Sequence, residues 1–195
     1  MFRSFFTALA ALMLTAAPAF AHTGVGAASG FAAGFTHPVL GLDHVLAMIA
    51  VGILAAQMGG RSLWLVPTAF VAMMAVGGLM GVAALGLPFV ETGIVGSVIV
   101  LGAVIAVGRQ LPVALAMTLV GGLALFHGHA HGTEMPVTAS GLEYGIGFMV
   151  ATAALHVAGI LSVITLRAAA AHAAPLALRA GGGAIAVMGM ALFIS

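Results

Sequence analysis

The sequence has 195 residues, of which 63% are hydrophobic and only 5% are charged. A soluble globular domain has about 25% charged residues, so this composition excludes a water-soluble globular protein and indicates an integral membrane protein. The net charge of +1 without a basic cluster argues against nucleic acid as a partner, and the absence of cysteine excludes disulfides and thiolate metal sites.

Residues 1–21 have the features of a secretory signal peptide. Arg3 precedes an apolar centre from Phe5 to Ala16, and the segment ends in the small-x-small pattern that signal peptidase accepts. An uncleaved first transmembrane helix is the alternative, but the apolar run is short for a span. Cleavage would leave His22 as the N-terminus outside the cytoplasmic membrane, where its amine and imidazole form a bidentate metal chelate. An idle terminus is the alternative for His22.

Residues 22–195 are predicted to form one all-α domain, a polytopic bundle of six transmembrane helices. A span needs about 20 apolar residues, and six such runs lie between polar breaks. They lie near 37–57, 63–85, 91–108, 111–128, 141–165 and 176–194. The remaining piece, Thr23–Thr36, has glycines at small-xxx-small spacing, which favours a short helix packed on the bundle rather than a span.

The arginines predict the orientation of the bundle. After residue 21 they all fall in connections on one side of the expected membrane, whereas Glu91 and Glu134 fall on the other side. The four arginines are Arg61, Arg109, Arg167 and Arg179. Under the positive-inside rule the arginine side is cytoplasmic, which places the mature N-terminus in the periplasm, as a cleaved signal also requires.

The first expected span contains HPVLGLDHVLAM, residues 37–48. If this segment is one helix, His37 and His44 are two turns apart on the same face, and Asp43 lies about 100° from His44. An aspartate near the bilayer centre costs roughly 2.5–3.5 kcal/mol, a cost that indicates a function. We therefore predict that all three are metal ligands. A buried hydrogen-bonded pair that joins helices is the alternative for Asp43 and His44.

A second polar cluster, FHGHAHGTE, covers residues 126–134. His127, His129 and His131 alternate with small residues and Glu134 follows, so the sequence predicts a flexible metal-binding run at the outer mouth of the bundle. A histidine-rich surface loop that binds metal only incidentally is the alternative.

The fifth expected span contributes GLEYGIGFMVATAALHVAG, residues 141–159, with His156 on the order of 20 Å deeper than Glu143. His156 is predicted to be the lowest metal ligand, below Asp43 and His44, with a helix-joining hydrogen bond as its alternative. Imidazole and carboxylate ligands without thiolate favour Ni²⁺, Co²⁺ or similar ions.

Together these three motifs resemble the signatures of the HupE/UreJ family of bacterial nickel permeases, some of which carry cobalt for hydrogenase or urease. The resemblance covers the mature chain and implies an inner-membrane protein that imports the ion from periplasm to cytoplasm by facilitated diffusion. It assigns metal-motif positions to His37, Asp43 and His44, to His127, His129, His131 and Glu134, and to His156.

The sequence therefore predicts a transition-metal permease rather than an enzyme, with the metal ion as substrate, no prosthetic group, and the lipid bilayer as its surroundings. A copper or zinc transporter stays open because the chain has 12 methionines. A membrane metal sensor that does not transport also stays open. A membrane metalloenzyme is disfavoured because HExxH and GxSxG motifs are lacking. The glycine faces serve folding and homo-oligomer formation equally, so the oligomeric state is left open.

Overall fold

The computed structural model describes residues 30–135 and 140–194, and all regular elements within these ranges are α-helices. The predicted signal peptide, residues 1–21, lies outside the described residues, as do His22 and residues 23–29.

The helices follow one another with short connections. They are α2 (Gly30–Leu40), α3 (Leu42–Met58), α4 (Ser62–Val82), α5 (Val90–Val107), α6 (Val113–Thr133), α7 (Gly141–Ala169) and α8 (Ala174–Phe193). The last five are each long and apolar enough to cross a membrane, and the bent pair α2 and α3 passes the same test as a broken sixth span. The prediction of an all-α polytopic membrane protein is confirmed.

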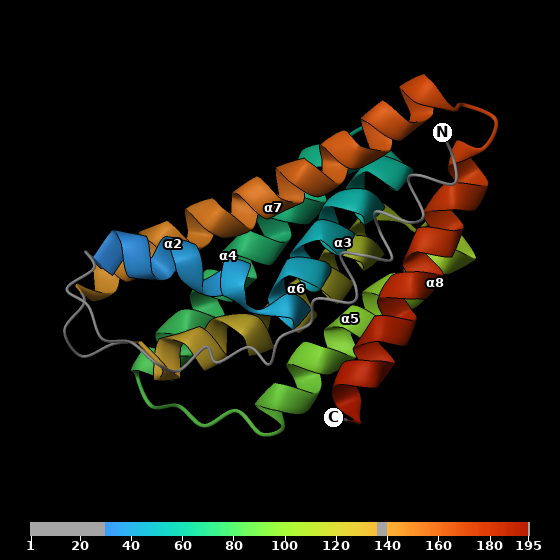
Figure 1. Ribbon diagram of the computed structural model, residues 1–195. Helices are drawn as coiled ribbons and strands as arrows, with labels where there is room; N and C mark the ends of the chain where they lie inside the picture. The colour runs from blue at the N-terminus through green and yellow to red at the C-terminus, as the bar shows by residue number, and fades with distance from the viewer. Residues whose placement is uncertain (1–29, 136–139, 195) are drawn as a thin grey trace.

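Glycines set how closely the helices approach. In Figure 1, α5 and α8 run side by side, as do α2 and α7. A side chain at Gly34 would meet the backbone of Tyr144 across the α2–α7 contact, and one at Gly52 would meet the backbone of His156 across the α3–α7 contact. Close backbone approach is the usual source of helix association in lipid, so these glycines hold the bundle together.

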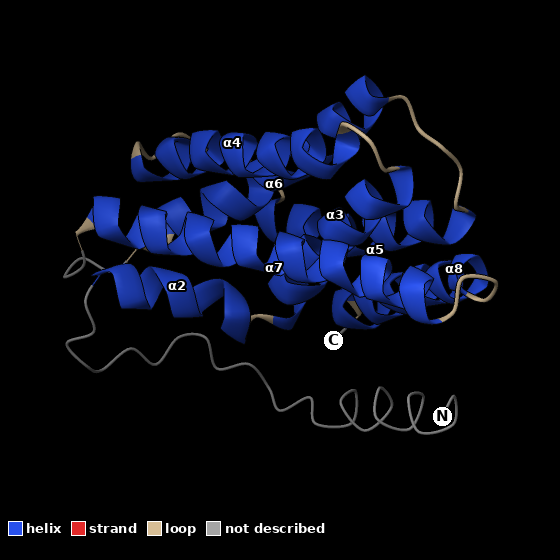
Figure 2. Cartoon of the chain, turned by 90° about the horizontal axis from the view of Figure 1, so that it is seen from above, coloured by secondary structure: helices blue, strands red, loops and turns tan. Residues whose placement is uncertain are grey.

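The first span is broken, which corrects the expectation of one continuous helix over 37–57. Gly41 has an extended backbone (φ −89°, ψ 118°), and the axes of α2 and α3 differ in direction by 83°. His37 therefore lies in the last turn of α2 and His44 in the first turn of α3, not on one face of one helix. Figure 2 shows α2 lying along α7 and turned away from α3. The apolar run was read as continuous through its polar residues, so the break at Gly41 was not expected.

The fourth expected span, 111–128, is also longer than predicted. Helix α6 continues to Thr133, so the whole of the histidine-rich motif up to that residue is helical. The prediction of a flexible run was therefore wrong for residues 126–133, which are part of α6. Its alternating histidines are spread around a helix.

Candidate metal site

Helix α6 presents His127 and His131 on one face, because residues four apart differ by only about 40° around a helix. This face points into the bundle, where His127 is 0% exposed and His131 is 4% exposed. The predicted depth order was therefore wrong for these two histidines. They lie in the protein interior, not at its outer mouth.

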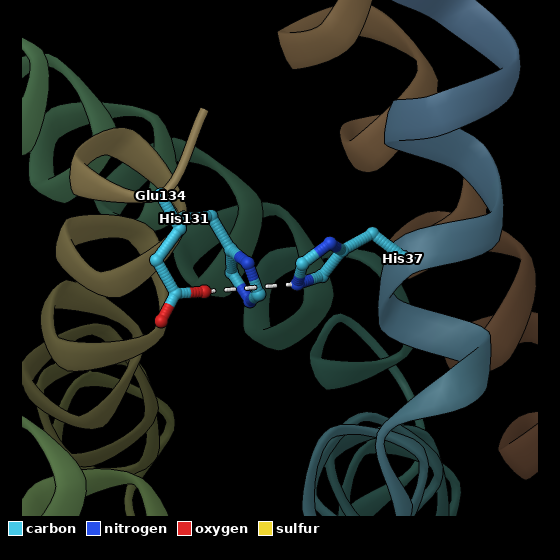
Figure 3. A group of neighbouring side chains, drawn as sticks. All are labelled: His37, His131 and Glu134. Atoms are coloured by element: carbon cyan, nitrogen blue, oxygen red, sulfur yellow. Dashed lines mark ion pairs between the residues drawn. The ribbon is translucent and has the colours of Figure 1, made fainter. Parts of the chain in front are cut away.

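His37, His131 and Glu134 form a group in which each side chain offers one ligand atom, and these atoms lie within 4.8 Å of one another. Figure 3 shows His37 reaching from α2 towards His131 of α6 and towards Glu134, which directly follows that helix, with the ion pair between His37 and Glu134 marked. In that pair the His37 Nε2 lies 3.9 Å from the Glu134 Oε2, and the side chains are 22% and 38% exposed. This group forms the accessible edge of the site.

A second layer lies deeper, where the His44 ring contacts both histidines of α6. The centroid of the His44 ring is 4.6 Å from that of His131 and 4.9 Å from that of His127. His37 completes the contact from the other side, with its ring centroid 4.7 Å from that of His131. Four imidazoles from α2, α3 and α6 thus form one continuous cluster. Because the chain bends at Gly41, His37 from α2 and His44 from α3 both reach this cluster.

Asp43 holds His44 rather than a histidine of a neighbouring helix. One carboxylate oxygen, Oδ1, accepts a hydrogen bond from the backbone N–H of His44 at 2.8 Å and lies 2.7 Å from its Nδ1. A carboxylate beside Nδ1 fixes the proton there and leaves the lone pair on Nε2. The His44 Nε2 is buried without a hydrogen-bond partner among the described residues.

Four buried ring nitrogens of this cluster have no hydrogen-bond partner among the described residues, and the others of this kind belong to His129 and His156. Both nitrogens of His131 and the Nδ1 of His127 are buried and lack a hydrogen-bond partner within the ranges that the structure covers. A buried polar atom without a partner carries a desolvation cost of about 1–3 kcal/mol. Several such nitrogens on rings in contact with one another form a set of ligands that a metal ion would satisfy.

Two residues of this region were missed by the sequence analysis. Ser97 of α5 is fully buried, and its hydroxyl lies 2.8 Å from the His127 Nε2. Phe70 of α4 is also fully buried, with its ring centroid 5.8 Å from that of His127 and 5.1 Å from that of His156. A buried serine and a buried phenylalanine are ordinary in membrane helices, so no local signal distinguished them.

The remaining predicted ligands lie apart from the cluster. His129 is turned away, since its Nε2 lies 2.7 Å from the backbone oxygen of Leu85 in the connection between α4 and α5. His156 is buried in contact with the ring of Phe70, and both of its ring nitrogens lack a partner among the described residues. The structure thus unites His37, Asp43, His44, His127, His131 and Glu134, and separates His129 and His156 from them.

A cavity of about 500 Å³ reaches His131 from the side, between α4, α6 and α7. Its other walls include Met74, Leu79, Leu142 and Met149, and are almost wholly apolar. A hydrated cation that entered this cavity would lose water ligands without gaining protein ligands, so the cavity is a poor entry route for the ion. The half-exposed pair of Glu134 and His37 is the polar approach to the cluster.

The fold and this cluster together define a class of protein, a polytopic membrane protein with an imidazole and carboxylate site inside its helix bundle. The chain belongs to the HupE/UreJ family, whose model, described as HupE / UreJ protein, matches residues 10–192. It is similar to Protein HupE of Rhizobium leguminosarum bv. viciae, with 46% identity over 189 residues that cover 96% of each chain. No solved structure matches. Family membership confirms the resemblance and supports a membrane role associated with nickel or cobalt transport.

Proposed function

We propose that the protein is a permease that imports Ni²⁺ or Co²⁺ from the periplasm to the cytoplasm by facilitated diffusion, for use by hydrogenase or urease. In this proposal the segment 1–21 is a cleaved signal peptide, the protein lies in the bacterial inner membrane, and the mature N-terminus is periplasmic. The observation that carries the proposal is the cluster of four imidazoles inside the bundle next to Glu134. Three of these rings, those of His44, His127 and His131, have buried nitrogens without a hydrogen-bond partner among the described residues.

The gradient of exposure gives the order in which the ion meets its ligands. Glu134 and His37 are partly exposed, His131 is 4% exposed, and His127 is fully buried. A hydrated cation first meets a carboxylate and an imidazole that replace some of its water, and then passes to imidazoles only. Weak sites in series are what permeation requires, because a site that binds too tightly does not release its ion.

The separations within the outer group fit transient binding. Ligand atoms on one metal ion are about 3–3.5 Å apart, since each lies about 2.1 Å from the ion. The three atoms of His37, His131 and Glu134 lie within 4.8 Å, so the side chains close by about 1.5 Å around an ion. Small rotations of a half-exposed carboxylate and imidazole supply this movement.

We assign Asp43 the role of a positioning residue. It holds the ring of His44 through Nδ1 and leaves the buried Nε2 as the nitrogen available to a metal ion. The ion itself is held by His44, His37, His131 and His127, with Glu134 at the approach.

Below His127 the next imidazole is His156, and the ring of Phe70 stands between the two. The ion therefore leaves the cluster when this ring turns aside, and His156 receives it on the way to the opposite membrane face. His129 and His22 have no assigned part in this path.

The proposal is tested by uptake of radioactive nickel and cobalt into cells that contain equal amounts of each variant. We expect His44→Ala and Asp43→Asn to reduce uptake strongly, whereas His172→Gln, an exposed histidine at the other end of the bundle, leaves it unchanged. Competition between the two metals, with copper and zinc as further competitors, identifies the ion. Unchanged metal accumulation in both cluster variants would contradict transport and favour a sensor.

A further inference from the structure

A second polar pocket lies at the end of the bundle where α7 connects to α8 (Figure 1). Its volume is about 410 Å³, and its polar lining comes from four residues on four different segments. These are Gln57 at the end of α3, Gln110 after α5, Arg167 near the end of α7, and Arg179 in α8. The proposed metal path does not use any of them.

Both guanidinium groups are anchored by backbone carbonyls. Arg167 donates hydrogen bonds to the oxygens of Ala56 and Gln57 at 3.1 and 3.4 Å, and the Nε of Arg179 donates to the oxygen of Ala106 at 2.9 Å. The stem of Arg179 packs against Gly108, where a side chain would contact it. The arginines are therefore held at the pocket with part of their hydrogen-bonding capacity left over, since each guanidinium has five N–H donors.

Among the described residues, the positive charge of this pocket has no acidic partner. The chain has four acidic side chains, Asp43, Glu91, Glu134 and Glu143, and none of them lines the pocket or pairs with Arg167 or Arg179. Asp43 begins α3 and Gln57 ends it, which separates them by about 21 Å along the helix. The carbonyl ends of α3, α5 and α7 at this pocket carry partial negative charge, which offsets the two positive charges only in part.

The pocket also contains the beginning of a helix. Ala174 and Pro175, the first two residues of α8, line it, and a helix N-terminus favours negative charge. Pro175 has no N–H and the Ala174 N–H is donated to the Ala170 oxygen, so this helix start contributes its dipole rather than hydrogen bonds. Gln57 and Gln110 each donate to one backbone carbonyl and keep a second N–H on the same nitrogen. Two guanidinium groups and two carboxamides around one cavity form a donor set suited to a phosphate group, which guanidinium binds through two parallel hydrogen bonds.

We propose that this pocket binds a phosphate group, supplied by the headgroup of an anionic phospholipid or by soluble phosphate. The lipid source fits the position of the pocket at the end of a membrane-spanning bundle, on the side that carries the arginines. Anionic headgroups are attracted to basic residues at such positions. The site would tie α3, α5, α7 and α8 together at this membrane face, independently of metal transport.

The test uses the purified full-length protein in detergent and measures binding of phosphatidylglycerol by native mass spectrometry, with phosphatidylcholine as the zwitterionic comparison. We expect Arg167→Gln combined with Arg179→Gln to weaken binding of phosphatidylglycerol about tenfold or more. The matched control is Arg61→Gln, which removes a charge at the same end of the bundle outside the pocket and should leave binding unchanged. In a second arm, inorganic phosphate is added without lipid. If it alone raises the thermal unfolding midpoint of the wild type but not of the double variant, the source is soluble phosphate.

A second pair of variants keeps the anchoring hydrogen bonds intact. Ala171→Glu places a carboxylate in the pocket, whereas Ala168→Glu places one on an exposed position of α7 outside it. The proposal requires Ala171→Glu to abolish the preference for phosphatidylglycerol, or the response to phosphate, while Ala168→Glu retains it. Equal binding by the two glutamate variants, or no response of the wild type to either probe, would overturn the proposal.

Discussion

The histidines of α6 alternate in the sequence, but they lie on two different faces of the helix and make different contacts. The face with His127 and His131 points into the cluster of imidazoles, whereas the side chain of His129 turns to the backbone of Leu85. The difference follows from helix geometry, since residues two apart differ by about 200° and residues four apart by about 40°. A run of histidines thus becomes a metal site only where the helix period brings them together. Both faces are buried, since His129 is only 6% exposed, so the distinction rests on what each ring contacts and not on exposure. Substitutions on each face separate the metal ligands from the residues that support or pack against them.

The largest expected effect is that of His131→Gln. His131 contacts both His37 and His44 and belongs to the outer group of ligands, so its loss interrupts the cluster at its centre. We expect nickel uptake to fall to that of cells without the protein. Membrane levels of the variant, measured by immunoblot, provide the control. Uptake above half of the wild-type value at equal protein levels would refute the assignment.

The next largest effect is expected for Gly128→Ala, on the adjoining face of α6. A side chain at this position would meet the backbone of Met74 in α4, whereas one at Gly122, also in α6, would contact nothing. Overpacking costs about 1–3 kcal/mol or more, so the thermal unfolding midpoint of the purified Gly128→Ala variant should fall clearly. Gly122→Ala is the matched control and should melt like the wild type. Equal melting of the two variants would show that the α4–α6 contact does not depend on close approach at Gly128.

A moderate effect is expected for Ser97→Ala. The Ser97 hydroxyl lies 2.8 Å from the His127 Nε2, so its removal frees the ring that it orients. Loss of such a supporting hydrogen bond costs about tenfold in metal affinity or activity. We expect nickel uptake at low metal concentration to fall by this order and to recover in Ser97→Thr, which retains the hydroxyl. If Ser97→Ala and Ser97→Thr take up nickel equally, the hydroxyl does not orient His127.

The smallest effect on transport is expected for His129→Gln. Its ring bonds to the connection between α4 and α5, so the change removes a hydrogen bond worth about 1 kcal/mol and no metal ligand. The unfolding midpoint should decrease slightly, while uptake per protein molecule stays at the wild-type value. A loss of uptake as large as that of His131→Gln would remove the distinction between the two faces.

The sequence was enough to predict that the protein spans a membrane and to locate five of its six spans. It also indicated that the segments now seen as α2, α3 and α6 supply residues of the candidate metal site. Apolar runs between polar breaks locate spans well, because the bilayer requires continuous apolar helix. The break at Gly41 was missed because the polar residues around it were interpreted as metal ligands on one continuous helix. Asp43 two residues later was the available signal, since an acidic residue in the first turn is typical of a helix start.

The geometry of the candidate site was less accessible to sequence analysis. His127, His129 and His131 were read as a loop because small and polar residues usually mark the end of a span. Inside a bundle, however, glycines mark close packing, and Gly128 and Gly132 pack directly on α4. Ser97 and Phe70 approach the site only through contacts between helices far apart in the sequence. The sequence therefore identified the candidate ligands, but it did not show which of them lie together in the folded protein.

The most direct measurement is nickel X-ray absorption spectroscopy on the purified protein, comparing the wild type with His131→Gln and His129→Gln. If the inward face of α6 holds the ion, the wild type and His129→Gln give the same imidazole signal, and His131→Gln loses imidazole ligands or fails to bind nickel. An unchanged spectrum in His131→Gln, or the loss of imidazole ligands in His129→Gln instead, would contradict this account.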